Sequence, residues 1–391
     1  MKLIPIHPFP ARMAPEIAID ELAKLASPKI VLDPMSGSGT VLRAASELGH
    51  SAIGFDLDPL SVLMARVWTT PFQVARLTRA AEELVGRAKT TRDVHLSWID
   101  DCAETREYVK FWFRQKQARP LRRLAFALSG KTGVVADAMR VALSRIIITK
   151  ERGASVARDT SHSRPHRVFL ENEYDVYAGF LQSVKQLASK LNPDRLIGSA
   201  VVHGGDSRKL ADLLSESVDV VITSPPYLNA IDYLRGHRLS LVWLGYGVSD
   251  IQKLRSNSIG AERSADAGVS EHLLGPLLMS CAEMEKLPIR QQGMVRRYAH
   301  DVHSFMQELA RITKKGGRVL LVVGNSCLNG VSISNANINV AAAEMVGLRL
   351  AERTERILPN SNRYLPMPPS HLSGSLSGRM RTETLLSFCA A

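Results

Sequence analysis

The sequence predicts an α/β protein built on a mostly parallel, twisted sheet that has helices on both faces and carries helical insertions. Three observations support this prediction. Apolar runs of strand length alternate with helical apolar spacing over the first 70 residues, buried-strand patterns return after residue 198, and two unusual motifs directly follow predicted strands. In an open parallel sheet, ligands bind outside the carboxyl ends of the strands, which is where both motifs fall.

Residues 1–70 have the pattern of a βαβα unit. Residues 30–32 form a short apolar run that leads into the loop "DPMSGSGT", and the helical spacing of "VLRAASELGH" ends at Gly49. A second apolar run in "SAIGFDLDP" ends in acidic residues and precedes the helical stretch "LSVLMARVW". Asp58, next to Pro59, is suited to cap this second helix.

The pattern changes over residues 71–197, which are rich in arginine and helical, with no strong run of strands. Strand patterns return at 200–206, 219–223 and 317–325, and "RLAERTERIL" and "TETLLSFC" are predicted to form an antiparallel pair. We therefore predict one domain that combines residues 1–70 with 198–391, including an excursion at about 234–300. Residues 71–197 are predicted to be a basic, mainly helical insertion.

Charge and cysteine content narrow the functional classes. The chain has 50 Lys and Arg against 38 Asp and Glu, a formal net charge of +12, which favours a nucleic-acid partner, although solubility alone is an alternative explanation. The four cysteines form no C-x-x-C pair, so we predict neither a metal site nor a disulfide framework. Prolines interrupt the N-terminal segment, and no apolar run reaches about 18 residues, so we expect a cytoplasmic protein without a membrane partner.

The loop "DPMSGSGT" has the features of a nucleoside-binding turn. Gly37 and Gly39 permit a tight turn and a close approach of the backbone to a ligand, and Asp33 supplies an acceptor at the strand end. The loop lacks the third glycine of a dinucleotide fingerprint and the Gly-Lys-Ser/Thr of a phosphate loop. Asp56 ends the next strand, at a separation that suits a carboxylate accepting two ribose hydroxyls. We therefore expect a nucleoside-containing ligand.

The corner "TSPPY" follows the predicted strand at 219–223. Proline fixes φ and restricts the preceding residue, so Ser224 and Pro225 are expected to be extended, with the Pro225 carbonyl outside any helical ladder. A rigid pair of acceptors of this kind suits the two hydrogens of an exocyclic amine, and Tyr227 can lie flat against the ring that bears it. The alternative is a proline turn with a packing tyrosine.

These residues resemble the S-adenosylmethionine-dependent amino-methyltransferases, which methylate the exocyclic nitrogen of adenine or cytosine in DNA. "DPMSGSGT" is similar to their D-P-x-x-G-S-G-T cofactor loop, and "TSPPY" to their (D/N/S)-P-P-(Y/F) catalytic motif. The resemblance implies a Rossmann-like methyltransferase fold in which residues 1–70 and 198–391 bind the cofactor and carry the catalytic residues. The resemblance does not account for the two insertions, one of which is expected to read the target; residues 71–197 are the favoured target-recognition region because they are longer and more basic than the excursion at about 234–300.

The resemblance implies roles for individual residues. Asp56 would bind the ribose of S-adenosylmethionine, and Asp206 would bind the adenine amino group. The "HPFPARMAPEIA" segment is similar to one that leans on the carboxylate end of the cofactor. The implied cofactor-binding residues are Asp33, Pro34, Gly37, Gly39, Thr40, Asp56 and Asp206, and the implied catalytic residues are Ser224, Pro225, Pro226 and Tyr227.

In that family, a serine in the first position of the motif is more often associated with cytosine N4 than with adenine N6. The resemblance therefore favours cytosine. A neutral hydroxyl is a weaker acceptor than a carboxylate, which offers mild physical support. The amine of a flipped base would attack the methyl group in line, so that catalysis depends on alignment and on acceptors for the developing positive charge. No cysteine nucleophile is required.

Basic residues interleaved with aromatic ones predict a phosphate-binding surface within 71–197. The alternative for each cluster is a solvated helix face. Beyond Tyr227, Arg235, with His237 and Arg238 nearby, is a candidate for gripping the strand beside the flipped base. The predicted nucleic-acid-binding residues are Arg114, Arg122, Arg123, Arg158, Arg164, Arg167 and Arg235.

The sequence thus favours a site-specific DNA methyltransferase acting on duplex DNA with one flipped base, and it leaves open a cognate restriction endonuclease as a partner. One alternative is an enzyme that methylates an exocyclic amine of transfer RNA, because a similar corner suits any planar amine. The other is a non-enzymatic DNA-binding module. A damaged cofactor loop would mark such a module, whereas Asp33, Gly37, Gly39 and Asp56 are all present in order.

Overall fold

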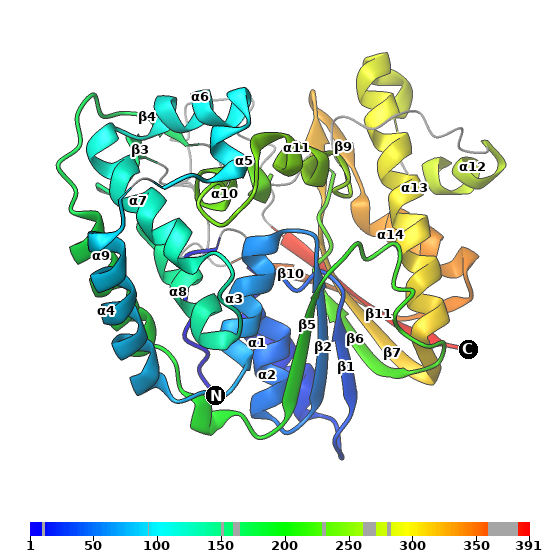
Figure 1. The fold of residues 1–391 in the computed structure, drawn as a ribbon. Helices are drawn as coiled ribbons and strands as arrows, with labels where there is room; N and C mark the ends of the chain where they lie inside the picture. The colour runs from blue at the N-terminus through cyan, green and yellow to red at the C-terminus, as the bar shows by residue number, and fades with distance from the viewer. Residues whose placement is uncertain are drawn as a thin grey trace. The chain divides into compact units, whose positions relative to one another are not determined.

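The structure is a computed structural model that describes residues 1–9, 12–92, 94–149, 152–158, 165–228, 232–260, 271–279, 283–358 and 382–391. The chain divides into two compact units. The first contains Met1–Ala26, Ser36–Gly204 and Asp232–Arg255, and the second contains Ser27–Met35, Gly205–Ile231 and Ser256–Ala391. Each unit is described by itself below (Figure 1).

Within the described part of the second unit, five strands lie side by side in the order β10-β11-β7-β6-β1. β1 is parallel to β6, with Val31 opposite Val220, and β6 is parallel to β7. β11 runs antiparallel to both β7 and β10, which confirms the predicted antiparallel pair. Apolar side chains of β1, β6 and β7 are buried, as expected for strands in the middle of a sheet. The strand bounds are β1 (Ile30–Asp33), β6 (Val218–Thr223), β7 (Thr313–Gly324), β10 (Leu348–Ile357) and β11 (Thr382–Ala390).

Three helices and a small hairpin complete the described part of the second unit. The longest helix, α13 (Ile289–Ile312), buries an apolar stripe that includes Val295, Phe305 and Leu309. It packs against α14, which also contacts β10. The buried residues of α13 extend from Met294 to Ile312, so the apolar stripe runs along most of the helix. The other elements are α12 (Glu271–Met279), η2 (Met284–Lys286), β8 (Ser326–Leu328), β9 (Val331–Ile333) and α14 (Asn335–Met345).

The first unit contains the predicted strand–helix repeat around β2 and β5, which are parallel. α2 and α3 both contact β2, and α3 also contacts β5. The buried Arg43 of α2 is satisfied by Glu47, by the Trp68 carbonyl and by the Asn192 carbonyl, so the charge inside this packing is paired. The bounds are α1 (Pro15–Ala23), α2 (Thr40–Glu47), β2 (Ser51–Asp56), α3 (Pro59–Thr69) and β5 (Ser199–Gly204).

Residues 71–197 are mainly helical, and α10 and α11 lie in the same unit. α4 packs against α7 and α9, while α8 packs against α3 and α9 (Figure 1). The role of this segment in target recognition stays a prediction. The bounds are α4 (Val74–Thr90), α5 (Ser97–Asp100), α6 (Ala103–Trp112), α7 (Gln115–Leu128), α8 (Val134–Arg145), β3 (Ala157–Arg158), β4 (His166–Arg167), α9 (Val176–Ala188), η1 (Pro193–Arg195), α10 (Tyr233–Leu241) and α11 (Val248–Ser256).

Alternation of strands and helices along the chain, together with parallel pairing of β1 with β6, β6 with β7 and β2 with β5, confirms the predicted α/β class. Within the described residues, antiparallel pairing is found where β11 joins β7 and β10, and in the two small hairpins β3–β4 and β8–β9. Within the described ranges, no helix combines the length and apolar character needed to cross a membrane.

Candidate active site

The glycine loop after β1 needs both of its glycines. Gly37 and Gly39 have φ values of +50° and +89°, in the left-handed region that other residues rarely adopt. A Cβ atom on Gly39 would lie 2.9 Å from the Cα atom of Ala65 in α3, and one on Gly37 would lie 3.2 Å from the ring of Phe9. The loop is therefore enclosed by α3 and by the N-terminal segment. The contact of this segment with the carboxylate end of a cofactor, which the resemblance implies, stays a prediction, and Pro10 within the segment lies outside the described residues.

Three hydroxyl groups of this loop find no hydrogen-bond partner in the described part of the chain. The side chains of Ser36, Ser38 and Thr40 are each no more than 5% exposed. Their oxygen atoms have no partner among the residues that the structure describes. A buried hydroxyl without a partner costs free energy. The cluster of such groups in one loop is therefore consistent with a polar ligand, and it distinguishes the loop from an ordinary strand–helix turn.

The carboxylate of Asp56 faces the glycine loop from the end of β2. One of its oxygens accepts a hydrogen bond from the Gly37 backbone at 2.7 Å, and the other accepts one from the Asp58 backbone at 2.9 Å. Burial, assisted by the charge of Asp58, raises the pKa of Asp56 to about 7, although these two N–H groups and His237 oppose the rise. The side chain keeps part of its surface exposed, so a ligand can reach it.

Asp58 and His237 form a buried pair beside Asp56. One oxygen of Asp58 caps α3 by accepting from the Leu60 backbone at 2.9 Å, which confirms the predicted cap. The other contacts Nδ1 of His237 in α10. Burial alone would lower the pKa of His237, but the charge and hydrogen bond of Asp58, with the charge of Asp56, raise it above its usual value.

This pair corrects an expectation from the sequence. His237 is only 7% exposed, so it does not face a bound strand as the sequence suggested. Its ring lies near that of Phe9, which also stacks on Tyr233 with a centroid distance of 5.1 Å. No local signal in the sequence indicated this arrangement, because 179 residues separate the two members of the ion pair.

The carboxyl ends of β1 and β6 are joined by side chains. Thr223, the first residue of "TSPPY", donates a hydrogen bond to Oδ1 of Asp33 at 2.7 Å, and the Met35 backbone donates to the same oxygen at 3.2 Å. Asp33 is only 3% exposed. This hydrogen bond therefore links Thr223, the first residue of "TSPPY", to Asp33, the first residue of "DPMSGSGT". A direct contact of Asp33 with a cofactor stays a prediction.

The "TSPPY" corner holds its acceptors in fixed positions. The Ser224 hydroxyl donates to the Val322 carbonyl at 3.0 Å, so its lone pairs are available to a ligand donor. The Pro225 carbonyl accepts no hydrogen bond from the described residues. Burial, with the nearby charge of Glu383, raises the pKa of Tyr227 to about 12, which keeps its phenol neutral. Pro226 and Tyr227 remain part-exposed, so the corner can be approached.

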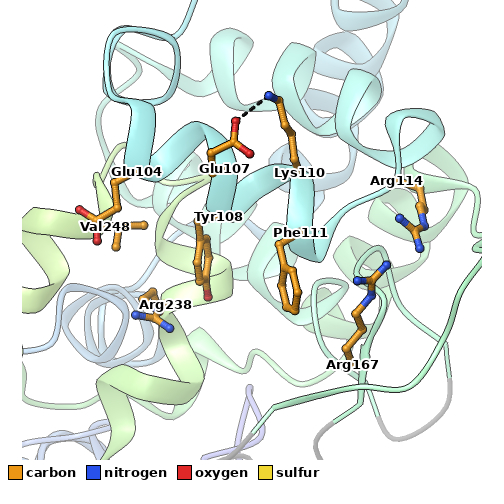
Figure 2. Close-up of a pocket in the computed structure, with 9 residues that line it drawn as sticks. All are labelled: Glu104, Glu107, Tyr108, Lys110, Phe111, Arg114, Arg167, Arg238 and Val248. Carbon is orange, nitrogen blue, oxygen red and sulfur yellow. Dashed lines mark hydrogen bonds and ion pairs between the residues drawn. The ribbon is translucent and has the colours of Figure 1, made fainter.

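Asp206 and the predicted basic residues have varied surroundings. Asp206 pairs with Arg208 at 2.6 Å, so its carboxylate already has a partner. Arg122 pairs with Asp100, whereas Arg114 and Arg167 line one surface depression (Figure 2). The exposed Arg158 and Arg235 and the half-buried Arg123 lie outside that depression, and Arg164 lies outside the described residues. Among the described residues, no group of three or more His, Cys, Asp or Glu is arranged to hold a metal ion.

Sequence comparison finds relatives along nearly the whole chain. The type II methyltransferase M.MvaI of Kocuria varians is 22% identical over 411 residues, covering 97% of this chain and 89% of that protein. M.AvaI of a Nostoc species and M.BsoBI of Geobacillus stearothermophilus are 24% and 23% identical, each covering 82% of this chain and 73% of its own length. The chain is related to the type II methyltransferases. No family model matches the sequence.

This relationship confirms the resemblance inferred from the two motifs. It adds no assignment of individual residues, so the site of this type II methyltransferase relative rests on the geometry above. Structure comparison matches the chain to a methyltransferase from Methanosarcina mazei, with a TM-score of 0.34, 7% identity and 94% coverage of each chain. Another is the rRNA methyltransferase AviRa of Streptomyces viridochromogenes, with a TM-score of 0.32, 13% identity and coverage of 98% and 89%.

Proposed function

We propose that this protein is an S-adenosylmethionine-dependent, site-specific DNA methyltransferase. It transfers a methyl group to an exocyclic amine of a flipped base, with cytosine N4 preferred over adenine N6. The observation that carries the proposal is the hydrogen bond between Asp33 and Thr223, because it joins the start of the glycine loop to the start of the "TSPPY" corner. Amine acceptors held in fixed positions at adjacent strand ends suit the alignment that a methyl transfer requires.

The residues of the glycine loop suit the cofactor. The ionised carboxylate of Asp56 would accept the ribose hydroxyls, and the unpartnered hydroxyls of Ser36, Ser38 and Thr40 supply polar groups beside it. Gly37 and Gly39 allow the backbone to approach a ligand closely. When bound, S-adenosylmethionine supplies a methyl group on a positively charged sulfur.

The "TSPPY" residues would hold the amine of the flipped base. Ser224 donates a hydrogen bond to the Val322 carbonyl, so its oxygen would accept one hydrogen of the amine. The Pro225 carbonyl would accept the second amine hydrogen. Both acceptors stabilise the positive charge that develops on the nitrogen as it attacks. Tyr227, kept neutral by its raised pKa, would stack on the base.

The preference for cytosine is supported by Ser224 at the first position of the corner. Its neutral hydroxyl is a weaker hydrogen-bond acceptor than a carboxylate at that position would be. A restriction endonuclease of matching specificity is the partner that we propose for a relative of type II enzymes.

The test is a turnover assay with isotope-labelled S-adenosylmethionine on duplex genomic DNA and on transfer RNA, followed by mass spectrometry of the nucleosides. We expect N4-methylcytosine in DNA. Ser224→Ala should abolish transfer while binding of the cofactor in calorimetry survives, and the exposed Ser215→Ala, in the same unit, should behave as the parent protein. Label in transfer RNA alone would contradict the proposal, and N6-methyladenine would reverse its base preference.

A further inference from the structure

An open depression lies on the first unit, beside α6, with a volume of about 640 Å³. Its centre is formed by Tyr108 and Phe111, which are three residues apart and therefore share one face of the helix. Figure 2 shows both rings pointing from α6 into the depression, with Arg238 and Arg167 beside them. The lining residues are Glu104, Glu107, Tyr108, Lys110, Phe111, Arg114, Arg167, Arg238 and Val248.

Each ring carries a guanidinium group from a distant segment of the chain. The Cζ atom of Arg238, in α10, lies 4.6 Å from the ring centroid of Tyr108. The Cζ atom of Arg167, in β4, lies 5.0 Å from the ring centroid of Phe111. A cation–π contact holds a guanidinium group close to a ring, and the group keeps its capacity to donate hydrogen bonds to an anion. The two rings therefore position two arginines on this surface.

Neither arginine is neutralised by an ion pair within the described part of the chain. The acids of the depression have other partners, because Glu107 pairs with Lys110, which also lines the depression, at 2.6 Å, and Glu104 accepts from Gln252 at 2.8 Å. In addition, Nε of Arg238 is buried without a hydrogen-bond partner. By contrast, Arg122 on the neighbouring helix α7 is committed to Asp100.

We propose that this face of α6, the Tyr108–Phe111 surface, binds phosphate groups of the nucleic-acid backbone through Arg167 and Arg238. Guanidinium groups match phosphate oxygens in bidentate geometry, and stacking on a ring reduces the freedom that would be lost on binding. Phe111 is 49% exposed and offers an apolar surface to a sugar or base next to the phosphate. The depression is open, and the two arginines that lie over its rings come from separate segments, which suits a chain of phosphates better than one small anion.

This inference rests on the proposed function, since it says where the nucleic acid is held. Its test is fluorescence anisotropy with a labelled DNA duplex over a series of salt concentrations. The double variant Arg167→Gln/Arg238→Gln should lower the slope of log affinity against log salt by about 1 for each arginine. The matched control is Arg76→Gln/Arg79→Gln, which removes the same charge from exposed positions on α4.

A more specific variant is Phe111→Leu, which keeps apolar volume and all charges but removes the ring under Arg167. We expect weaker binding of the duplex, with an unchanged thermal unfolding midpoint. Cofactor binding, measured by calorimetry, should be unaffected in every variant, which separates this surface from the glycine loop.

Three outcomes would overturn the inference. One is an equal loss of affinity in the double variant and its matched control, which would indicate a general effect of charge. Another is full retention of affinity in the double variant, even if methylation of DNA is observed and the proposed function stands. The third is a parent protein that binds neither duplex DNA nor transfer RNA. If it binds transfer RNA alone, the proposed substrate is wrong, and the same variants measured on transfer RNA decide the role of the surface.

Discussion

The hydroxyl group of Thr223 donates a hydrogen bond of 2.7 Å to the carboxylate of Asp33, although 190 residues separate the two in the sequence. Both residues stand at the carboxyl ends of parallel neighbouring strands, β1 and β6, where the polypeptide leaves the sheet. Parallel pairing brings such ends to one edge, and the hydrogen bond then sets their spacing. A substitution at either residue should therefore disturb both motifs.

Thr223→Val is expected to destabilise the protein and slow methyl transfer. The substitution keeps the shape of the side chain but leaves a buried carboxylate oxygen with one donor fewer, which costs about 1–3 kcal/mol. Urea unfolding and turnover measure the two effects. Thr69→Val is the matched control, because the hydroxyl of this buried threonine bonds only to a carbonyl of its own helix. Equal losses in both variants would contradict a specific role for the Asp33–Thr223 bond.

Gly39→Ala should weaken cofactor binding and lower stability. The new Cβ atom would lie 2.9 Å from the Ala65 backbone in addition to requiring a φ of +89°, so α3 or the loop must move. The expected cost is about 1–3 kcal/mol or more. Gly130→Ala isolates the backbone contribution, since Gly130 has a φ of +71° with no atom within 4 Å of the added Cβ. Equal free energies of unfolding in the two variants would show that the contact with Ala65 does not contribute to the loss of stability.

Cofactor affinity should rise as the pH increases through about 7. The pKa of Asp56 is raised to about 7, so its carboxylate is protonated below that pH and ionised above it. Only the ionised form accepts hydrogen bonds with both oxygens from ribose hydroxyls. Calorimetry of S-adenosylmethionine binding across this range measures the effect. Asp56→Asn should bind weakly and with a flat pH profile; a profile that persists in this variant would assign the titration to another group.

Stability of the ligand-free protein should change in the opposite direction. Because the pKa of Asp56 is raised in the folded state, the folded protein binds a proton at pH values where the unfolded chain has released it. This proton binding stabilises the folded state, and the stabilisation is lost as the pH rises toward about 7. The raised pKa of His237 acts with the same sign, because its contribution is complete below the unfolded pKa and is lost as the pH rises through the folded value. The melting temperature should therefore fall through neutral pH, and less so in Asp56→Asn.

His237→Phe is expected to weaken cofactor binding at neutral pH and less at higher pH. The charge of His237 lowers the pKa of Asp56, so its removal leaves more of that carboxyl protonated near pH 7. It also leaves the buried Asp58 without its partner, which should reduce stability. The pH dependence of the dissociation constant distinguishes the two effects. His95→Gln, at an exposed position, is the control. A loss of affinity that is constant with pH would indicate only a structural role.

Much of the fold could be predicted because its signals are local. The apolar runs that became β1, β2, β6 and β7, the positive φ values at Gly37 and Gly39 and the cap formed by Asp58 all depend on residues a few positions apart. Backbone geometry also makes the proline corner predictable, since proline restricts its own φ and the residue before it.

The tertiary structure alone decided which side chains met. Arg122 and Arg167 both belong to basic clusters of the sequence, yet Arg122 is paired with Asp100, whereas Arg167 lies over the ring of Phe111 and has no ion-pair partner among the described residues. His237 looked like a residue of a binding surface and instead lies buried against Asp58. The physical reason is the same in each case: the energy of a charged side chain depends on the groups within a few ångströms of it, and for these residues those groups come from segments far along the chain.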